Sequence, residues 1–241
     1  MNYRMILFFC TIALNIKTMD AQINAAKITY ERKTNLYKKF KGSDDVKEWL
    51  KEEDKNKLDV FELYFNDSLS VFKPQESDLV ERMSWSTNKN TVYQNKITNH
   101  RLTIKEIWGE KFLVDDSIRI CKWKITESKR NICGYQCRKA ITNINDSTRL
   151  YAWFCSELNA TIGPESLGGL PGTILGLATE DGGVIYFAKN IEIIKPSLET
   201  LLPKKTKAKI YKTAELKAQI AKNFGNQKWV KMMLFDQFEI W

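Results

Sequence analysis

The chain has 241 residues, of which 43% are hydrophobic and 12% aromatic, and its formal net charge is +9. A chain of this length and apolar content can bury one substantial core, which excludes an intrinsically disordered protein. The positive charge is concentrated near the end, where residues 204–231 hold nine lysines and one acid, Glu215. The part before this tail is close to neutral.

The first twenty-one residues are predicted to be a signal peptide. Arg4 supplies the positive start, Met5–Ile16 form an apolar run too short to cross a membrane, and cleavage is expected after Ala21. Cys10 follows Phe9, whereas a lipid-modified cysteine needs a small residue before it, so we do not expect a lipoprotein. The sequence therefore predicts an exported protein with no membrane-spanning segment.

The rest of the chain has mainly strand character. Apolar and polar residues alternate in short runs that are separated by turn residues such as Asn66-Asp67-Ser68 and Asn145-Asp146-Ser147. The predicted strands, in chain order, are Lys27–Arg32, Val60–Phe65, Leu69–Phe72, Thr91–Ile97, Arg101–Trp108, Lys111–Val114, Ser117–Ile125, Asn131–Ile144, Arg149–Ser156, Gly183–Phe187 and Asn190–Ile194. Helices are predicted over Asp44–Glu53, which Ser43 can cap, and over Thr213–Asn223, which ends before Gly225.

Short strands with tight turns predict a mainly β fold (α+β by content). We expect an antiparallel meander curled into a half-barrel or barrel-like sheet, with one or two packed helices. Residues 22–203 are expected to form a single β-rich domain, and residues 204–241 a basic C-terminal helix or tail.

A glycine-rich segment between Gly163 and Gly183 is the most distinctive feature, because it holds seven of the eleven glycines. Glycine concentrates where the backbone takes a positive φ or approaches another surface closely. The segment is either a structural corner that closes the sheet, which we favour, or a loop that contacts a ligand or partner. It lacks the lysine and the spacing of a phosphate-binding loop. The residues that define it are Gly163, Pro164, Gly169, Leu170, Pro171 and Gly172.

Three segments in order resemble the GLPGLI family of exported Bacteroidetes proteins. The residues Gly134-Tyr135-Gln136-Cys137-Arg138-Lys139-Ala140 are similar to its GYxCxKA strand, Ala152-Trp153-Phe154 to its AWY strand, and Gly169-Leu170-Pro171-Gly172-Thr173-Ile174-Leu175 to its naming motif. The chain departs from the family at Thr173 and Cys155. The resemblance implies residence in the periplasm or at the outer membrane, and it implies no reaction.

Four cysteines follow the predicted signal peptide, an even number that favours disulfides in an exported protein. If the strands pair around a turn at Thr126–Arg130, we expect Cys121 and Cys133 to be linked, and pairing around Asn145-Asp146 predicts a link between Cys137 and Cys155. Four buried thiols are the alternative. The spacing does not have the paired knuckles of a zinc site, so no metal is predicted.

No catalytic constellation stands out in the sequence. His100 is the single histidine and is expected in a solvated turn, and acid pairs such as Asp115-Asp116 are common in any chain. Our leading hypothesis is a non-enzymatic exported protein, without a cofactor, that binds an apolar ligand or an envelope-associated partner. The alternatives are a hydrolase that uses carboxylates near Glu157 and Glu165, and a structural or assembly protein of the envelope. The Lys204–Lys231 tail is expected to face an anionic membrane surface, and no nucleic-acid partner is expected.

Overall fold

The computed structural model describes residues 22–76, 82–225 and 227–240, so the predicted signal peptide lies outside the described residues. In this part of the chain, twelve strands form one open sheet in the order β12-β6-β5-β4-β3-β2-β1-β11-β10-β9-β8-β7. The strands are β1 (Ala26–Asn35), β2 (Asn56–Phe65), β3 (Leu69–Pro74), β4 (Thr91–Asn95), β5 (His100–Ile107), β6 (Glu110–Ser117), β7 (Lys124–Ile132), β8 (Tyr135–Asn145), β9 (Thr148–Cys155), β10 (Thr173–Thr179), β11 (Val184–Glu192) and β12 (Ile210–Tyr211). The expected fold, a mainly β curled antiparallel sheet with packed helices, is confirmed. Among the named strands, only the short β12 runs parallel to its neighbour, β6.

Short helices and helical turns accompany the sheet. They are α1 (Leu36–Lys39), α2 (Asp44–Trp49), η1 (Glu52–Lys55), η2 (Ser84–Ser86), η3 (Pro164–Ser166), α3 (Leu198–Leu201), α4 (Thr213–Phe224), α5 (Lys228–Leu234) and η4 (Phe235–Ile240). The predicted helix at residues 44–53 is therefore interrupted, because Leu50 takes an extended conformation after α2. None of the helices described is long and apolar enough to span a bilayer.

Local sequence explains why the strands turn where they do. The side chain of Asn66 accepts hydrogen bonds from the backbone amides of Ser68 and Leu69, so it closes the turn between β2 and β3. Asn145 binds the amide of Ser147 in the same way between β8 and β9. Both hairpins follow the turn positions expected from the sequence.

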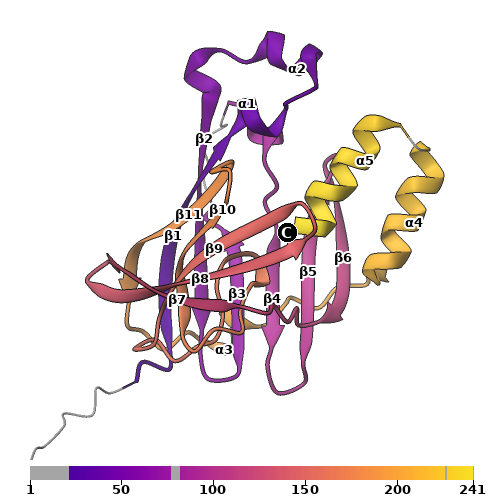
Figure 1. The fold of residues 1–241 in the computed structure, drawn as a ribbon. Coiled ribbons are helices and arrows are strands. Elements are labelled where there is room, and N and C mark those ends of the chain that lie inside the picture. The colour runs from indigo at the N-terminus through magenta and orange to yellow at the C-terminus, as the bar shows by residue number, and fades with distance from the viewer. Residues whose placement is uncertain (1–21, 77–81, 226, 241) are drawn as a thin grey trace, which may run out of the picture.

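The sheet curls so that β7, β8 and β9 lie across the first strands (Figure 1). The main core fills the space between the two halves and includes residues of β1, β2, β9, β10 and the glycine-rich segment. The Tyr30 hydroxyl of β1 donates a hydrogen bond of 2.6 Å to the Ile174 carbonyl oxygen of β10, and the Phe61 and Phe72 rings stack 4.9 Å apart. Burial of this apolar surface is the main force that holds the curl.

The C-terminal segment packs on the outer strands of the sheet. Leu216, Ile220 and Val230 are buried against Ile107 of β5 and Val114 of β6, and they form a second apolar cluster. In Figure 1, α4 and α5 stand beside β5 and β6. Residues 210–240 are therefore part of the folded body, although their lysines make the sequence read as a free tail.

The pairing of β7 with β8 differs from the expectation. The turn lies at Cys133-Gly134 instead of Thr126–Arg130, and residues 118–123 form no strand. β7 is mostly exposed, so its sequence has no alternation that would fix the register. Cys121 therefore precedes β7, and Cys133 lies in the turn itself.

All four cysteines are free thiols in the structure, so neither predicted disulfide is present. The shifted turn removes the register on which the Cys121–Cys133 pair was based. Cys137 and Cys155 still face each other, because the pairing of Arg138 with Phe154 continues by one position to these two residues. Burial, followed by the neighbouring Cys155, raises the pKa of the Cys137 thiol to about 12.

We expect oxidised glutathione to join Cys137 to Cys155 slowly and to leave Cys121 unlinked to Cys133. The two opposed thiols transfer two electrons to glutathione disulfide, which is reduced to two thiols, and the high pKa of Cys137 keeps the reactive thiolate scarce. Alkylation followed by mass spectrometry of peptides measures the linkage. A Cys121–Cys133 peptide would contradict the observed register.

Candidate functional site

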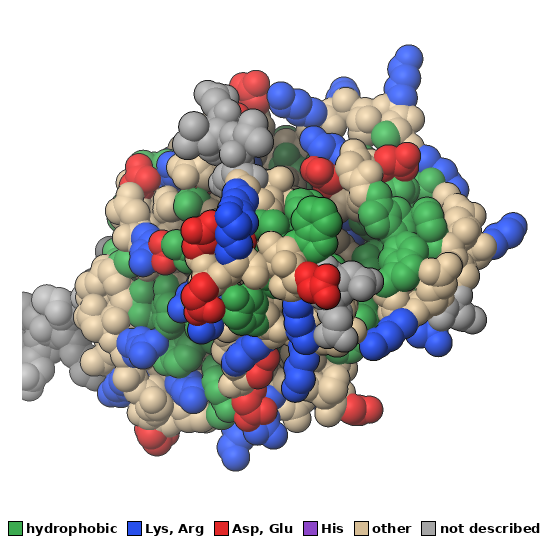
Figure 2. All heavy atoms as spheres, turned by 90° about the horizontal axis from the view of Figure 1, so that it is seen from above, with side chains coloured by type: hydrophobic (Ala, Val, Ile, Leu, Met, Phe, Trp, Pro, Cys, Tyr) green, Lys and Arg blue, Asp and Glu red, His purple; other side chains and the backbone are tan. Residues whose placement is uncertain are grey.

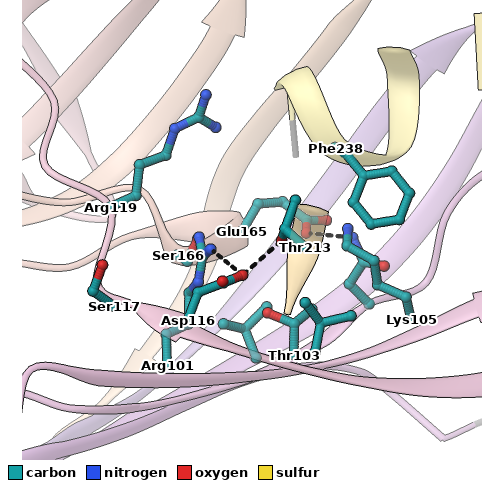
Figure 3. Close-up of a pocket in the computed structure, with 13 residues that line it drawn as sticks. Arg101, Thr103, Lys105, Asp116, Ser117, Arg119, Glu165, Ser166, Thr213 and Phe238 are labelled. Carbon is teal, nitrogen blue, oxygen red and sulfur yellow. Dashed lines mark hydrogen bonds and ion pairs between the residues drawn. The ribbon is translucent and has the colours of Figure 1, made fainter. Parts of the chain in front are cut away.

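A cavity of about 350 Å³ lies on the inner face of the sheet, between β4–β6, the glycine-rich segment and the C-terminal helices (Figure 3). Its walls are mainly polar, with cations, carboxylates and hydroxyl groups in close proximity. The residues that line it are Asn90, Val92, Arg101, Thr103, Lys105, Val114, Asp116, Ser117, Arg119, Glu165, Ser166, Thr213 and Phe238. This is the part of the described structure that can receive a small polar ligand.

Glu165 and Ser166 form one wall of the cavity and have an unusual backbone. Their φ angles are +53° and +68°, in the left-handed region that non-glycine residues seldom adopt. Such a conformation costs on the order of 1–3 kcal/mol per residue and persists only where the surroundings impose it. Strain of this kind concentrates at functional sites.

A buried network holds Glu165 in place. Tyr186 donates a hydrogen bond of 2.8 Å to Oε1, Asn90 donates one of 3.1 Å to Oε2, and the Arg32 guanidinium lies 3.7 Å from Oε1. Arg32 also forms an ion pair of 2.7 Å with Asp59. Because both oxygens of Glu165 are engaged, its carboxylate is a fixed acceptor in the cavity wall.

The opposite wall is built by β5, β6 and the start of α4. Arg101 donates a hydrogen bond of 3.2 Å to the Ser166 hydroxyl and lies 3.4 Å from Asp116, which accepts a bond of 2.6 Å from Thr213. Burial lowers the pKa of Arg101, and Asp116 opposes this effect. Figure 3 shows these side chains meeting across the floor of the cavity.

Lys105 contributes a second cation from β5. Its ammonium group points toward Glu165 and lies below the Phe238 ring, 5.1 Å from the ring centroid. It donates a hydrogen bond of 2.5 Å to the Gln237 carbonyl oxygen, so the last helical turn closes one side of the cavity. Burial lowers the pKa of Lys105 to about 8, and the negative charge of Glu165 opposes that shift.

Two polar atoms of the cavity lining have no hydrogen-bond partner within the described structure. They are Oδ1 of Asn90 and Nε of Arg101, both of them buried. A buried polar atom without a partner costs about 1–3 kcal/mol, so such atoms usually bind a ligand or an ordered water molecule. One acceptor and one donor on residues of the cavity wall are thus unpaired, and both atoms are covered by the surrounding protein.

The glycine-rich segment packs closely against the core and places Glu165 in the cavity wall. A Cβ on Gly163 would lie 2.6 Å from Cβ of Ile174, and one on Gly172 would lie 2.0 Å from the Cys155 carbonyl oxygen. Leu170 is buried in the main core. The segment is thus tightly packed, and it also carries two residues of the cavity, Glu165 and Ser166.

The other residues singled out in the sequence lie elsewhere. Glu157 is exposed at the end of β9, next to Tyr135 and Cys137, and it does not line the cavity with Glu165. His100 starts β5 and pairs with Asp115 at the surface, outside the cavity lining. No group of three or more His, Cys, Asp or Glu side chains suited to a metal ion occurs among the residues that the structure describes.

Similarity to known proteins assigns the chain to a family. The model of the family described as N-glycanase peptide, N-terminal domain, matches residues 49–218. The chain belongs to this family. The N-glycanase match includes the β4–β6 wall, Glu165 and Thr213, and it ends before α5 and Phe238.

Two solved structures of PNGF-II, in C2 and P21 crystal forms, share the fold. They align with TM-scores of 0.53 and 0.52 at 17% and 16% identity, over 78% of this chain and 31% of the PNGF-II chain in each case. The chain thus spans less than a third of the length of these larger proteins. No curated protein matches the sequence.

Most residues of the cavity were not singled out from the sequence. From the sequence, Glu165 was considered only as a possible catalytic partner of Glu157. Arg101, Lys105 and Asn90 look like ordinary strand and loop residues in the sequence. They come together because β4, β5 and the glycine-rich segment meet at the inner face of the curled sheet. A basic residue at an inward-facing position of a strand, as at Lys105, is the one feature of the sequence that could have indicated a polar site.

Proposed function

We propose that this chain is a non-catalytic binding module that holds part of a glycan in the cavity beside Glu165. The observation that carries the proposal is the strained Glu165–Ser166 pair, which lines an open cavity with mainly polar walls. A cavity of about 350 Å³ falls at the lower end of the range for small-molecule sites, roughly 300–1,000 Å³. One or two sugar rings have the corresponding size.

The chemistry of the walls supports a hydroxyl-rich ligand. A sugar hydroxyl both donates and accepts, so it can bond to polar side chains of the lining such as Ser117 and Arg119, which are not buried. Phe238 supplies an apolar face on which a sugar ring can lie. An apolar ligand would leave the buried polar groups unpaired at a cost of about 1–3 kcal/mol each. The N-glycanase family description supports the same class of ligand.

Glu165 is better placed to bind than to catalyse. A general acid or nucleophile needs a carboxylate oxygen that is directed at the substrate, but both oxygens of Glu165 are held by Tyr186, Asn90 and Arg32. Glu157 lies outside the cavity, so the hydrolase arrangement predicted as an alternative from the sequence has no counterpart in the site. A catalytic role for the chain on its own is therefore disfavoured. Export to an oxidising compartment remains part of the proposal.

Isothermal titration calorimetry with oligosaccharides released from a glycoprotein tests the proposal. The chain beginning at residue 22 should bind at least one such oligosaccharide. Ser117→Phe should weaken this binding at least tenfold, because Ser117 lines the cavity at an exposed position and a phenyl ring there fills the entrance without disturbing the core.

Ser147→Phe is the matched control, since Ser147 is exposed in the β8–β9 turn and lies outside the cavity. This variant should bind like the unmodified chain. Equal binding by both variants, or no binding of any released oligosaccharide, would reject the proposal.

A further inference from the structure

Four exposed tryptophans lie at one end of the molecule. The β2–β3 and β4–β5 turns mark the opposite end, so α2, η2 and the β5–β6 turn share the tryptophan-bearing end, next to α5 (Figure 1). The exposed fractions are 78% for Trp49, 64% for Trp85, 50% for Trp108 and 45% for Trp229. Seen from this end, Figure 2 shows hydrophobic side chains gathered in patches between basic ones.

Three aromatic rings at this end form a compact cluster on α4, α5 and the β5–β6 turn, termed the aromatic cluster. The ring of Trp108 lies 4.3 Å from that of Phe224 and 5.8 Å from that of Trp229, and the last two rings are 6.0 Å apart. Phe224 is 40% exposed, so the cluster remains open to solvent. Its members hold one another in place without being buried.

The backbone and a polar contact fix the orientation of the cluster. Trp108 has a φ of +53°, a left-handed conformation that is strained for a bulky side chain. Trp229 donates a hydrogen bond of 2.5 Å from its indole nitrogen to the Gln227 side chain. Packing into the core does not account for this strain, because half of the Trp108 side chain faces solvent.

Lysines surround the aromatic cluster. Lys222, Lys228 and Lys231 belong to the same two helices and are exposed. Lys228 also bonds to the Gly42 carbonyl oxygen, which ties α5 to the loop between α1 and α2. Exposed acids also occur here, because Glu106 and Glu110 lie two residues either side of Trp108. The helices α4 and α5 hold four lysines, Lys217, Lys222, Lys228 and Lys231, against one acid, Glu215, so their side of the cluster is basic.

We propose that the aromatic cluster and its lysines dock on the interface of an anionic lipid bilayer. Tryptophan rings settle at the level of lipid headgroups, and each lysine near an anionic surface adds about 1 kcal/mol. Protein partners are less well suited, because lysine is depleted at protein–protein interfaces. Phe224 and Trp229 lie beyond residues 49–218, whereas Trp108 lies within them, so only part of this surface belongs to the family-matched region.

Co-sedimentation with vesicles tests the inference. The chain beginning at residue 22 should bind vesicles that contain one quarter phosphatidylglycerol in phosphatidylcholine, and should bind pure phosphatidylcholine at least tenfold more weakly. Trp108→Ser with Trp229→Ser should reduce binding to the anionic vesicles at least tenfold. Unmodified protein should also show a blue shift of tryptophan emission when these vesicles are added.

The control variant carries Ile97→Ser and Ile120→Ser at the opposite end, where the two side chains are 80% and 86% exposed. It should bind vesicles like the unmodified chain, and circular dichroism should confirm that both variants are folded. Equal loss in the two variants, no vesicle binding, or an emission shift caused by soluble oligosaccharide and not by vesicles would overturn the inference. Ser117→Phe should leave vesicle binding intact, so the result is independent of the glycan proposal.

Discussion

Replacement of Gly172 by alanine should destabilise the protein by roughly 3–5 kcal/mol, because a steric clash and backbone strain act together. A Cβ at this position would lie 2.0 Å from the Cys155 carbonyl oxygen and 2.8 Å from Cα of Ser156, and both contacts are with backbone that cannot rotate away. The φ of +139° is also a conformation that side chains disfavour. Urea unfolding followed by circular dichroism measures the loss.

Gly182→Ala is the matched control within the same glycine-rich segment. Gly182 also has a positive φ, of +67°, but a Cβ there would meet no atom within 4 Å. Its replacement should therefore cost only the backbone strain, about 1–2 kcal/mol. Equal losses in the two variants would show that the close approach at Gly172 does not constrain the corner.

Arg32→Met should cost roughly 3–5 kcal/mol, the usual loss when one partner of a buried ion pair is removed. Arg32 is 3% exposed, and its guanidinium serves Asp59, Glu165 and the Asn88 carbonyl oxygen. The variant would remove the shortest ion pair of Asp59, which would keep only longer contacts of 3.8 Å to Lys57 and 3.7 Å to Lys89, and it would remove a cation beside the buried Glu165. The loss should be measured by urea unfolding at pH 7.

The direction in which pH changes the stability loss of Arg32→Met follows from the pKa of Asp59. Burial opposes the charged form of Asp59, but Arg32, Thr87 and Lys57 together outweigh that effect and lower the pKa of the carboxyl. The stabilisation is therefore fully present above the unfolded pKa of about 3.9, and it is lost as pH falls through the folded value. In Arg32→Met the pKa of Asp59 should rise, so the difference in stability between the two proteins should shrink from pH 7 to pH 4.

An exposed arginine provides the comparison for Arg32. Arg149 forms an ion pair of 2.8 Å with Glu180, and both side chains are about half exposed. Arg149→Met should leave the urea midpoint unchanged, because water screens such pairs. Two results would show that the buried network is not a source of stability. One is a stability difference between Arg32→Met and the original chain that grows on acidification, and the other is an Arg32→Met variant as stable as the original chain.

The strand pattern was sufficient to predict the class of fold. The β2–β3 and β8–β9 hairpins follow from alternation and from turn residues whose side chains bind the backbone, as at Asn66 and Asn145. The pattern fails where a strand is exposed on both faces. β7 carries mostly polar and charged residues, and its turn begins with Cys133, a residue with a positive φ that no turn rule anticipates.

The cavity was harder to predict because it depends on contacts between distant segments. Glu165 lies in a segment rich in glycine and proline, and its partners Arg32, Asn90 and Tyr186 come from other parts of the chain. The helix over Thr213–Asn223 was predicted, but whether the C-terminal segment packs on the sheet was left open, and Leu216, Ile220 and Val230 anchor it there. Membership of the GLPGLI family stays a prediction, since the matched family model is a different one.

A crystal structure with a bound oligosaccharide tests the central claim most directly. The sugar that calorimetry identifies as the best ligand should occupy the cavity beside Glu165, with hydroxyl groups bonded to polar side chains of the lining such as Ser117 and Arg119, and with a ring against Phe238. An oligosaccharide bound anywhere else on the protein, with this cavity still filled by water, would contradict the account.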